Sequence, residues 1–344
     1  MAHQHRVLVA LALPCALLVG CPTGVEDGFT NRVDNNAAVQ GSICTPSGTE
    51  SVAGATVAVY ADTDEDGVPD DDSVLASTTT ALDGTFTIEG LSAGEYVGVA
   101  TRGHHQGTFP ISYVGESGVR LDAACLEPDT ARIALVGGSC DDIAERMDTL
   151  DFVYETIDVG GSAWAELLTT SALLSSYDIL IAGCGMPDTW GGQAPTVSNV
   201  INGFLAAGGS LYVSGDAWPV VEAVDADLVD FFREDDDPDT VNVGVGQTVD
   251  ATVVAADLQP WFTSGTAEVL FDNDHPMIEA VGTDAEVLLT GTVRSVDFTT
   301  VEDAPLAVRA AGSGGGTILY SSFGLMSESD ADVEVLLDEL FLSL

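Results

Sequence analysis

Alternating apolar and polar positions fill short segments from residue 38 to about residue 126. Threonine, valine and aromatic residues alternate in segments such as AVQGSIC (38–44), GTFTIEGL (84–91) and GEYVGVAT (94–101), and turns rich in Gly, Pro and Asp separate them. A period of two residues is typical of strands with one buried face. The pattern predicts a small antiparallel β-sandwich over residues 38–127, with EPDT at 127–130 as the boundary.

From residue 131 the pattern changes to uniformly apolar strands separated by helical segments. The predicted strands are RIALVG (132–137), FVYETIDV (152–159), YDILIAG (177–183) and SLYVSG (210–215), and amphipathic segments lie between them. Strand and helix in alternation predict parallel strands with helical crossovers. We therefore expect a flavodoxin-like, three-layer α/β domain over residues 131–344. Further strands are expected between 248 and 323, and a closing helix over 331–342.

The N-terminus has the layout of a secretory signal: Arg6, an apolar run over 7–19, and small residues before Cys21. That run is short for a bilayer span. LVGC (18–21) resembles the lipobox of bacterial lipoproteins, which implies cleavage after residue 20, a lipid on Cys21 and a tether over 21–37. The expected location is then the bacterial cell envelope, periplasmic or outer surface, held to the membrane through the Cys21 lipid. An ordinary cleaved signal is the alternative.

The chain is strongly acidic: 55 Asp and Glu against nine basic residues, all arginine, give a formal charge of −46. Such a field repels phosphate backbones, so we expect no nucleic-acid partner, and it favours cations. Solubility alone would also explain the charge. The hydrophobic content of 46% is too high for a disordered acidic chain, so the charge lies on folded domains.

Four cysteines remain once Cys15 leaves with the signal and Cys21 carries lipid. An even number in an exported chain indicates disulfides, although four cysteines permit three connectivities. One pair lies on the first and last predicted strands of the sandwich, and the other follows two strands of the α/β sheet. We predict the bonds Cys44–Cys125 and Cys140–Cys184.

Residues 38–101 resemble the carboxypeptidase regulatory-like family, whose fold is a transthyretin-like sandwich. The resemblance is carried by VQGSICTPSGTESVAGATVAVY (39–60) and TTTALDGTFTIEGLSAGEYVGVAT (78–101). It implies an accessory module without catalytic residues.

An acidic loop, DTDEDGVPDDDS (62–73), is inserted after the second predicted strand. Alternate carboxylates before a glycine have the spacing of an oxygen-rich calcium loop. The loop has Ser73 where an EF-hand has its bidentate glutamate, and a solvated acidic loop is the alternative. We expect Ca²⁺, with ligands drawn from Asp62, Asp64, Asp66, Val68, Asp70 and Asp72.

The larger domain resembles the class I glutamine amidotransferase-like superfamily through RIALVGG (132–138), YDILIAGCG (177–185), AAGGSLYVSGDAW (206–218) and GSGGGTILYSSFG (312–324). The resemblance implies a nucleophilic cysteine in the turn that follows SLYVS and a histidine after the last long strand. Here the turn is Ser214-Gly215-Asp216, and Gly324 stands in the histidine position. We therefore expect a non-catalytic binding or structural protein, with a protein or a carbohydrate at the cell surface as its partner.

The alternative is a hydrolase or amidotransferase-like enzyme with an atypical site at the carboxyl edge of the sheet. Its candidate residues are Cys184, Ser214, Asp216 and Asp188. Neighbouring carboxylates would raise the pKa of a thiol and suppress the thiolate. His275 is expected in a turn near a strand end, where its ring satisfies a backbone group. Two tryptophans on loops at this edge would contact a sugar or a partner, or cover the core: Trp190 and Trp218.

Overall fold

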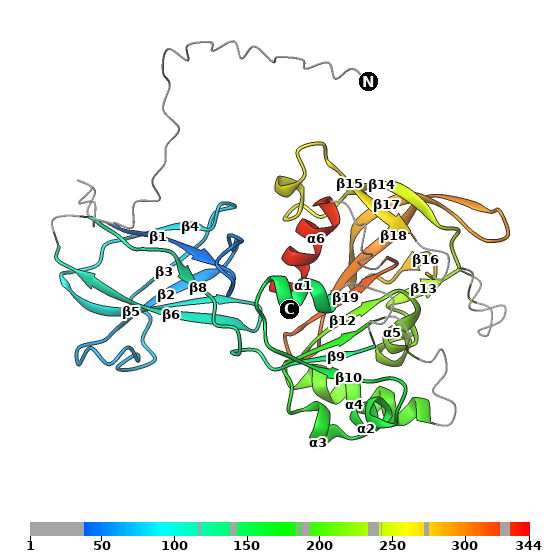
Figure 1. Ribbon diagram of the computed structural model, residues 1–344, viewed down its shortest axis with the longest axis horizontal. Helices are drawn as coiled ribbons and strands as arrows, with labels where there is room; N and C mark the ends of the chain where they lie inside the picture. The colour runs from blue at the N-terminus through cyan, green and yellow to red at the C-terminus, as the bar shows by residue number, and fades with distance from the viewer. Residues whose placement is uncertain are drawn as a thin grey trace, which may run out of the picture. The chain divides into compact units, whose positions relative to one another are not determined.

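The computed structural model describes residues 38–115, 118–137, 143–183, 186, 193–232, 241, 243–271, 275–323 and 331–344 (Figure 1). Cys21, Cys140, Cys184, Asp188 and Trp190 lie outside these residues, so the predictions made for them stay predictions. Among the helices in the described ranges, none combines the length and the apolar character that crossing a membrane requires.

Two four-stranded sheets make up the predicted sandwich. Alternation along these strands turns one row of side chains into the core between the sheets, including Val57, Phe86 and Ile88. The first sheet contains β4 (Thr85–Glu89), β1 (Ala38–Cys44), β7 (Val119–Arg120) and β8 (Ala124–Cys125). The second has the order β3 (Ala76–Thr79), β2 (Thr56–Ala61), β5 (Gly94–Arg102) and β6 (His105–Tyr113). One detail differs from the expected antiparallel pattern, because β7 and β8 pair parallel to β1.

Strand β6 was not among the predicted strands, although its side chains alternate strictly between buried and exposed. The sequence HQGTFPISY contains Gly107 and Pro110, which weaken a strand prediction. The structure accommodates Pro110 because β6 is the last strand of its sheet and pairs only with β5 there. A proline without an N–H is tolerated at such an edge.

A nine-stranded mixed sheet is the centre of the larger domain (Figure 1). When its five parallel strands are numbered along the chain, their order across the sheet is 2-1-3-4-5, which is the flavodoxin-like order. They are β10 (Tyr154–Ile157), β9 (Ile133–Val136), β11 (Ile179–Ala182), β12 (Ser210–Ser214) and β19 (Thr317–Ser321). Four antiparallel strands extend the sheet: β18 (Thr300–Ala311), β17 (Ala285–Arg294), β14 (Gln247–Val253) and β15 (Thr266–Phe271). The expected parallel sheet is therefore only about half of the observed one.

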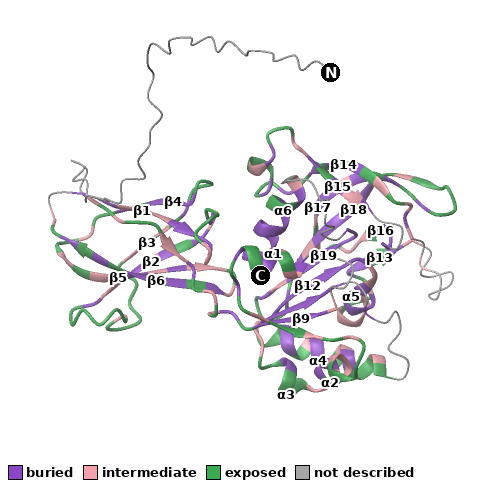
Figure 2. Cartoon of the chain, in the orientation of Figure 1, coloured by how far each residue is buried: buried purple, intermediate pink, exposed green. Residues whose placement is uncertain are grey.

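Helices cover both faces of this sheet, as the three-layer prediction requires. One face packs against α1 (Ile143–Thr149) and α6 (Ala331–Leu342). The other packs against α2 (Ala163–Thr169), α3 (Ser171–Leu174), α4 (Ala194–Ala206) and α5 (Pro219–Val224). Figure 2 shows the central strands as buried and the outer sides of α2 and α3 as exposed. A short two-stranded sheet, β13 (Val229–Phe231) with β16 (Ile278–Val281), was not predicted.

The β5–β6 turn of the sandwich contacts the C-terminal residues of the α/β domain. Gly103 has a φ of +56°, and a Cβ added there would lie 2.0 Å from the carbonyl oxygen of Leu344. The N–H of His104 donates to the same oxygen at 2.7 Å. The His105 ring lies 4.4 Å from the ring of Phe152. Buried side chains of both folds consequently belong to one hydrophobic cluster.

Candidate functional site

The acidic loop between β2 and β3 folds around Asp62, which is only 3% exposed. Its Oδ1 accepts the N–H of Asp66 and its Oδ2 accepts the N–H of Gly67, each at 3.1 Å. Asp70 Oδ2 accepts the N–H of Thr63 at 3.1 Å and its hydroxyl at 2.7 Å. These bonds bend the loop so that the carboxylates of Asp62 and Asp70 lie close together.

Three of the six expected calcium ligands come together. Carboxylate oxygens of Asp62, Asp64 and Asp70 all lie within 4.8 Å of one another. Asp66 instead accepts the N–H of Val68 at 2.9 Å, in a local turn. Asp66 and Asp72 are not part of the three-carboxylate group. The backbone carbonyl of Val68 stays a predicted ligand. Hard oxygen ligands in such a group suit Ca²⁺.

The carboxyl end of β12 forms the turn in which the amidotransferase resemblance places a nucleophile. Ser214 ends the strand and is fully buried, and Gly215 follows with a φ of +53°. Glycine adopts such a φ at no steric cost, and most other residues adopt it rarely. Asp216 is the next residue, in a short 3₁₀ turn over Gly215–Ala217. The left-handed position of this elbow is therefore a glycine without a side chain.

An imidazole fills the space above Gly215. A Cβ added to Gly215 would lie 2.6 Å from Cδ2 and 2.8 Å from Nε2 of His275. His275 is 7% exposed, and its ring makes an edge contact with Phe271 of β15 at 6.2 Å. His275 follows β15, near a strand end as expected, and the fold places its ring beside the elbow. Sequence spacing could not reveal the contact, because β12 and β15 are far apart in the sheet order and only the fold brings the loop back.

Buried hydroxyl groups complete the region. The Tyr320 hydroxyl donates to the carbonyl of Gly215 at 3.1 Å, and burial raises the pKa of this phenol, which keeps it a neutral donor. Tyr212 and Ser321 hydroxyls share a hydrogen bond of 2.8 Å. Trp218 packs its ring 5.2 Å from that of Phe231, so at least part of it covers the core.

The predicted disulfide Cys44–Cys125 is present. Its two cysteines are register partners in the parallel pair of β1 and β8. It joins the first strand of the sandwich to the last one and closes that fold on itself.

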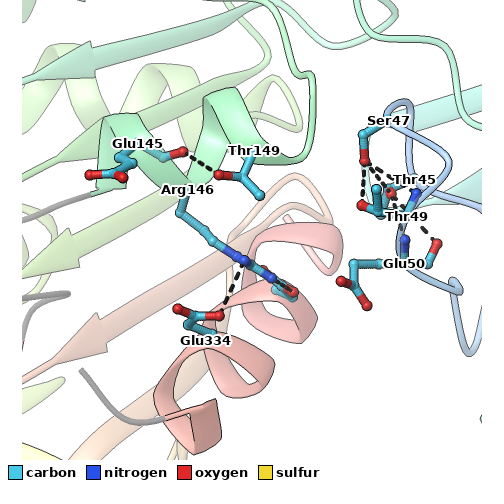
Figure 3. A network of polar contacts seen from close by, with 9 residues as sticks. Thr45, Ser47, Thr49, Glu50, Glu145, Arg146, Thr149 and Glu334 are labelled. Carbon is cyan, nitrogen blue, oxygen red and sulfur yellow. Dashed lines mark hydrogen bonds and ion pairs between the residues drawn. The ribbon is translucent and has the colours of Figure 1, made fainter. Parts of the chain in front are cut away.

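A group of charges on α6 lies against the sandwich and against α1. Arg146 of α1 binds Asp338 in a bidentate ion pair, with Nε 2.6 Å from Oδ1, and it also reaches Glu334 at 3.4 Å (Figure 3). Arg102 of β5 lies 3.6 Å from Glu339. Burial raises the pKa of Asp338 in spite of its arginine partner.

Two groups in this junction have pKa values displaced in opposite directions. Burial raises the pKa of Glu339 to about 7, and Arg102 only partly offsets that effect. Burial lowers the pKa of His105 to about 4. Each shift disfavours the charged form, which is the effect of low polarity around a titratable group.

Comparison with known proteins identifies no family by sequence: no protein-family model matches the chain, and no curated protein does. Similar solved structures include a protein described as a GMP synthase component from Thermoplasma acidophilum, at 10% identity and a TM-score of 0.42, covering 62% of this chain and 94% of that one. PurLQS from Thermotoga maritima matches at 13% identity and a TM-score of 0.35, covering 61% of this chain and 97% of that one. The 5-hydroxyisourate hydrolase of Klebsiella pneumoniae matches at 16% identity and a TM-score of 0.20, covering 26% of this chain and 90% of that one. These neighbours include glutamine amidotransferase-like and transthyretin-like proteins, and the likeness is too low to carry a function.

Proposed function

We propose that this chain is an exported, lipid-anchored binding or structural protein. In this proposal a non-catalytic amidotransferase-like domain is carried on a β-sandwich that calcium stiffens. Its acidic charge of −46 disfavours nucleic acid and favours cations. A protein or a carbohydrate at the cell surface is the proposed partner.

The observation that supports the lack of catalysis is the packing at the β12 elbow. An elbow works by holding a nucleophile out of the backbone on a strained turn, with a base within hydrogen-bond reach. Here that position is Gly215, which has no nucleophilic side chain, and the His275 ring occupies the space that a side chain would need. Ser214, the nearest hydroxyl in sequence, is fully buried and has no exposed surface to meet a substrate.

The alternative hydrolase is favoured by the same imidazole, since His275 lies beside the turn that contains Ser214 and Asp216. One experiment separates the two. The purified full chain is given glutamine and a panel of amides and esters, beside Ser214→Ala and His275→Ala variants. We expect no turnover above buffer from any of the three. Turnover by the parent chain that either variant abolishes would establish the hydrolase.

The calcium proposal rests on the carboxylates of Asp62, Asp64 and Asp70, which converge within 4.8 Å. Loops of this kind in extracellular modules bind at roughly 10⁻⁴ to 10⁻³ M. At ten times such a dissociation constant the stabilisation is about 1.4 kcal/mol, which melting curves resolve.

The matched variants are Asp64→Asn and Asp71→Asn. Asp64 belongs to the convergent group, whereas Asp71 is a neighbouring acid whose Oδ1 accepts the N–H of Ser73 at 2.8 Å. We expect Ca²⁺ to raise the melting temperature of the parent and of Asp71→Asn, and to raise that of Asp64→Asn much less. Identical curves in calcium and in chelator would remove the metal from the proposal.

The lipid anchor rests on LVGC at 18–21. Full-length protein expressed in a bacterial host should fractionate with membranes and gain the mass of a lipid on Cys21. A Cys21→Ser variant should lose both properties. Membrane association that is unchanged in Cys21→Ser would contradict the anchor.

A further inference from the structure

The amino edge of the parallel strands contains a hollow of about 460 Å³. It lies where β9 and β10 begin and where the chain turns into β11, at the opposite end of the strands from the Ser214–Asp216 turn. The volume falls within the roughly 300–1,000 Å³ that small-molecule sites occupy. Neither the calcium loop nor the β12 elbow contributes a residue to it.

Side chains around this hollow are held in place by partners on other elements. Arg132 donates from Nε and from Nη2 to the two oxygens of Asp178, each at 3.1 Å. The Tyr177 hydroxyl donates to Glu155 Oε2 at 2.6 Å, and this bond links the segment just before β11 to strand β10. Groups that are already ordered lose little side-chain freedom when a ligand binds.

Tyr154 forms another part of the wall. Its hydroxyl donates to Asp148 Oδ1 at 2.9 Å, which fixes the ring from helix α1. Burial raises the pKa of Tyr154 and of Tyr177 to about 12, so both rings are neutral. Beside them Val153 is 56% exposed and contributes apolar surface to the lining. The hollow therefore combines fixed aromatic rings and apolar surface with charged hydrogen-bonding groups.

Hydrogen-bonding capacity remains on these charged groups. A guanidinium has five N–H donors, and Arg132 uses two of them on Asp178 while its side chain stays 57% exposed. A carboxylate offers about four acceptor positions, and Tyr177 takes one on Glu155. Asp129 adds a second exposed carboxylate to the lining. Donors and acceptors thus face one ligand together.

The charges decide which ligand class fits. Asp129, Glu155 and Asp178 outnumber the single guanidinium of Arg132, so phosphates and carboxylates are repelled. A simple amine would have to approach that guanidinium. A neutral ligand rich in hydroxyl groups avoids both penalties, since each hydroxyl donates to a carboxylate or accepts from arginine.

We propose that this hollow binds a neutral sugar unit. The apolar C–H face of the sugar ring packs on the tyrosine rings, and its hydroxyl groups bond to Arg132, Glu155 and Asp129. The proposal rests on the binding role proposed above, but its test measures sugar affinity, whereas the proposed function is tested by turnover and membrane anchoring. Either can therefore fail without the other.

The test uses the purified full chain with glucose, galactose, mannose, N-acetylglucosamine and cellobiose as probes. Saturation-transfer NMR detects binding, and calorimetry gives the affinity. Glucuronic acid is the anionic probe that tests the charge argument. Variants are Tyr177→Ala, which removes a ring, and Tyr177→Phe and Arg132→Gln, which keep the shape and remove hydrogen bonds. Tyr60→Ala, on β2 of the sandwich, is the matched control.

We expect saturable binding of at least one neutral probe and binding of glucuronic acid that is weaker by about tenfold or more. Tyr177→Ala and Arg132→Gln should each lose about tenfold in affinity, Tyr177→Phe should lose less, and Tyr60→Ala should match the parent. If Tyr177→Ala fails to fold, judged by its melting curve, the other two variants decide. No saturable binding by any neutral probe overturns the proposal. So does binding that these variants leave intact but that Trp218→Phe abolishes, because the sugar would then lie at the carboxyl edge.

Discussion

The pKa values of His105 and Glu339 are shifted in opposite directions, so their effects on the pH dependence of stability offset each other. Replacing either residue should therefore reveal the effect of the other. Folding keeps His105 neutral down to about pH 4, whereas the unfolded histidine gains its proton near 6.5. The unfolded state therefore binds one more proton in this window, and the free energy of unfolding rises with pH. Folding keeps Glu339 protonated up to about pH 7, against 4.5 when unfolded, so here the folded state holds the extra proton and stability falls as pH rises.

Between about pH 4.5 and 6.5 the two contributions cancel, since each has a slope of about 1.4 kcal/mol per pH unit. Replacing one residue exposes the other. Relative to the parent, His105→Gln should lose stability with rising pH, and Glu339→Gln should gain it. The double variant should follow the parent curve. Urea unfolding at constant ionic strength measures these differences across the window, with Glu334→Gln on the same helix as the baseline.

The reasoning depends on burial of both groups at the junction, where His105 is 2% and Glu339 is 6% exposed. Arg102, Asp338 and Asp257 are the charged groups around Glu339, and His104 is the one that acts on His105. Slope differences of the same sign in both single variants, or none in either, would refute it. The first result would mean that another group titrates, and the second that water reaches both side chains.

Further predictions concern covalent and steric constraints. Reducing Cys44–Cys125, which are 81 residues apart, should lower the free energy of unfolding by about 4–5 kcal/mol in urea denaturation, and a loss below ~1 kcal/mol would contradict the loop-closure argument. Gly103→Ala should cost about 1–3 kcal/mol more than Gly67→Ala, because both have positive φ but only the first meets another atom; equal melting temperatures would show that the turn relaxes. Gly215→Ala should likewise destabilise the chain, because the added Cβ meets the His275 ring. Adding His275→Ala should restore part of the lost stability. If the free-energy changes of the two substitutions simply add in the double variant, the contact is disproved.

Local patterns were sufficient for much of this fold because strand and helix periods depend on near neighbours. The segment AVQGSIC became β1 over the predicted residues, and the four parallel strands predicted in the first half of the α/β domain all formed. The period of two also placed Phe86 and Ile88 in the core. Where a local rule conflicted with the tertiary context, as at Pro110 in β6, the prediction failed because edge position decides whether a missing N–H matters.

By itself the sequence determined the two successive fold types, the acidic surface, the Cys44–Cys125 bond and the set of acids that includes Asp62, Asp64 and Asp70. Only the tertiary structure decided which distant groups meet. It brought His275 onto the elbow at Gly215 and Tyr177 across to Glu155. The physical reason is that a strand or a loop follows from interactions within a few residues, whereas contacts between elements depend on sheet order and crossover path, which no local period encodes.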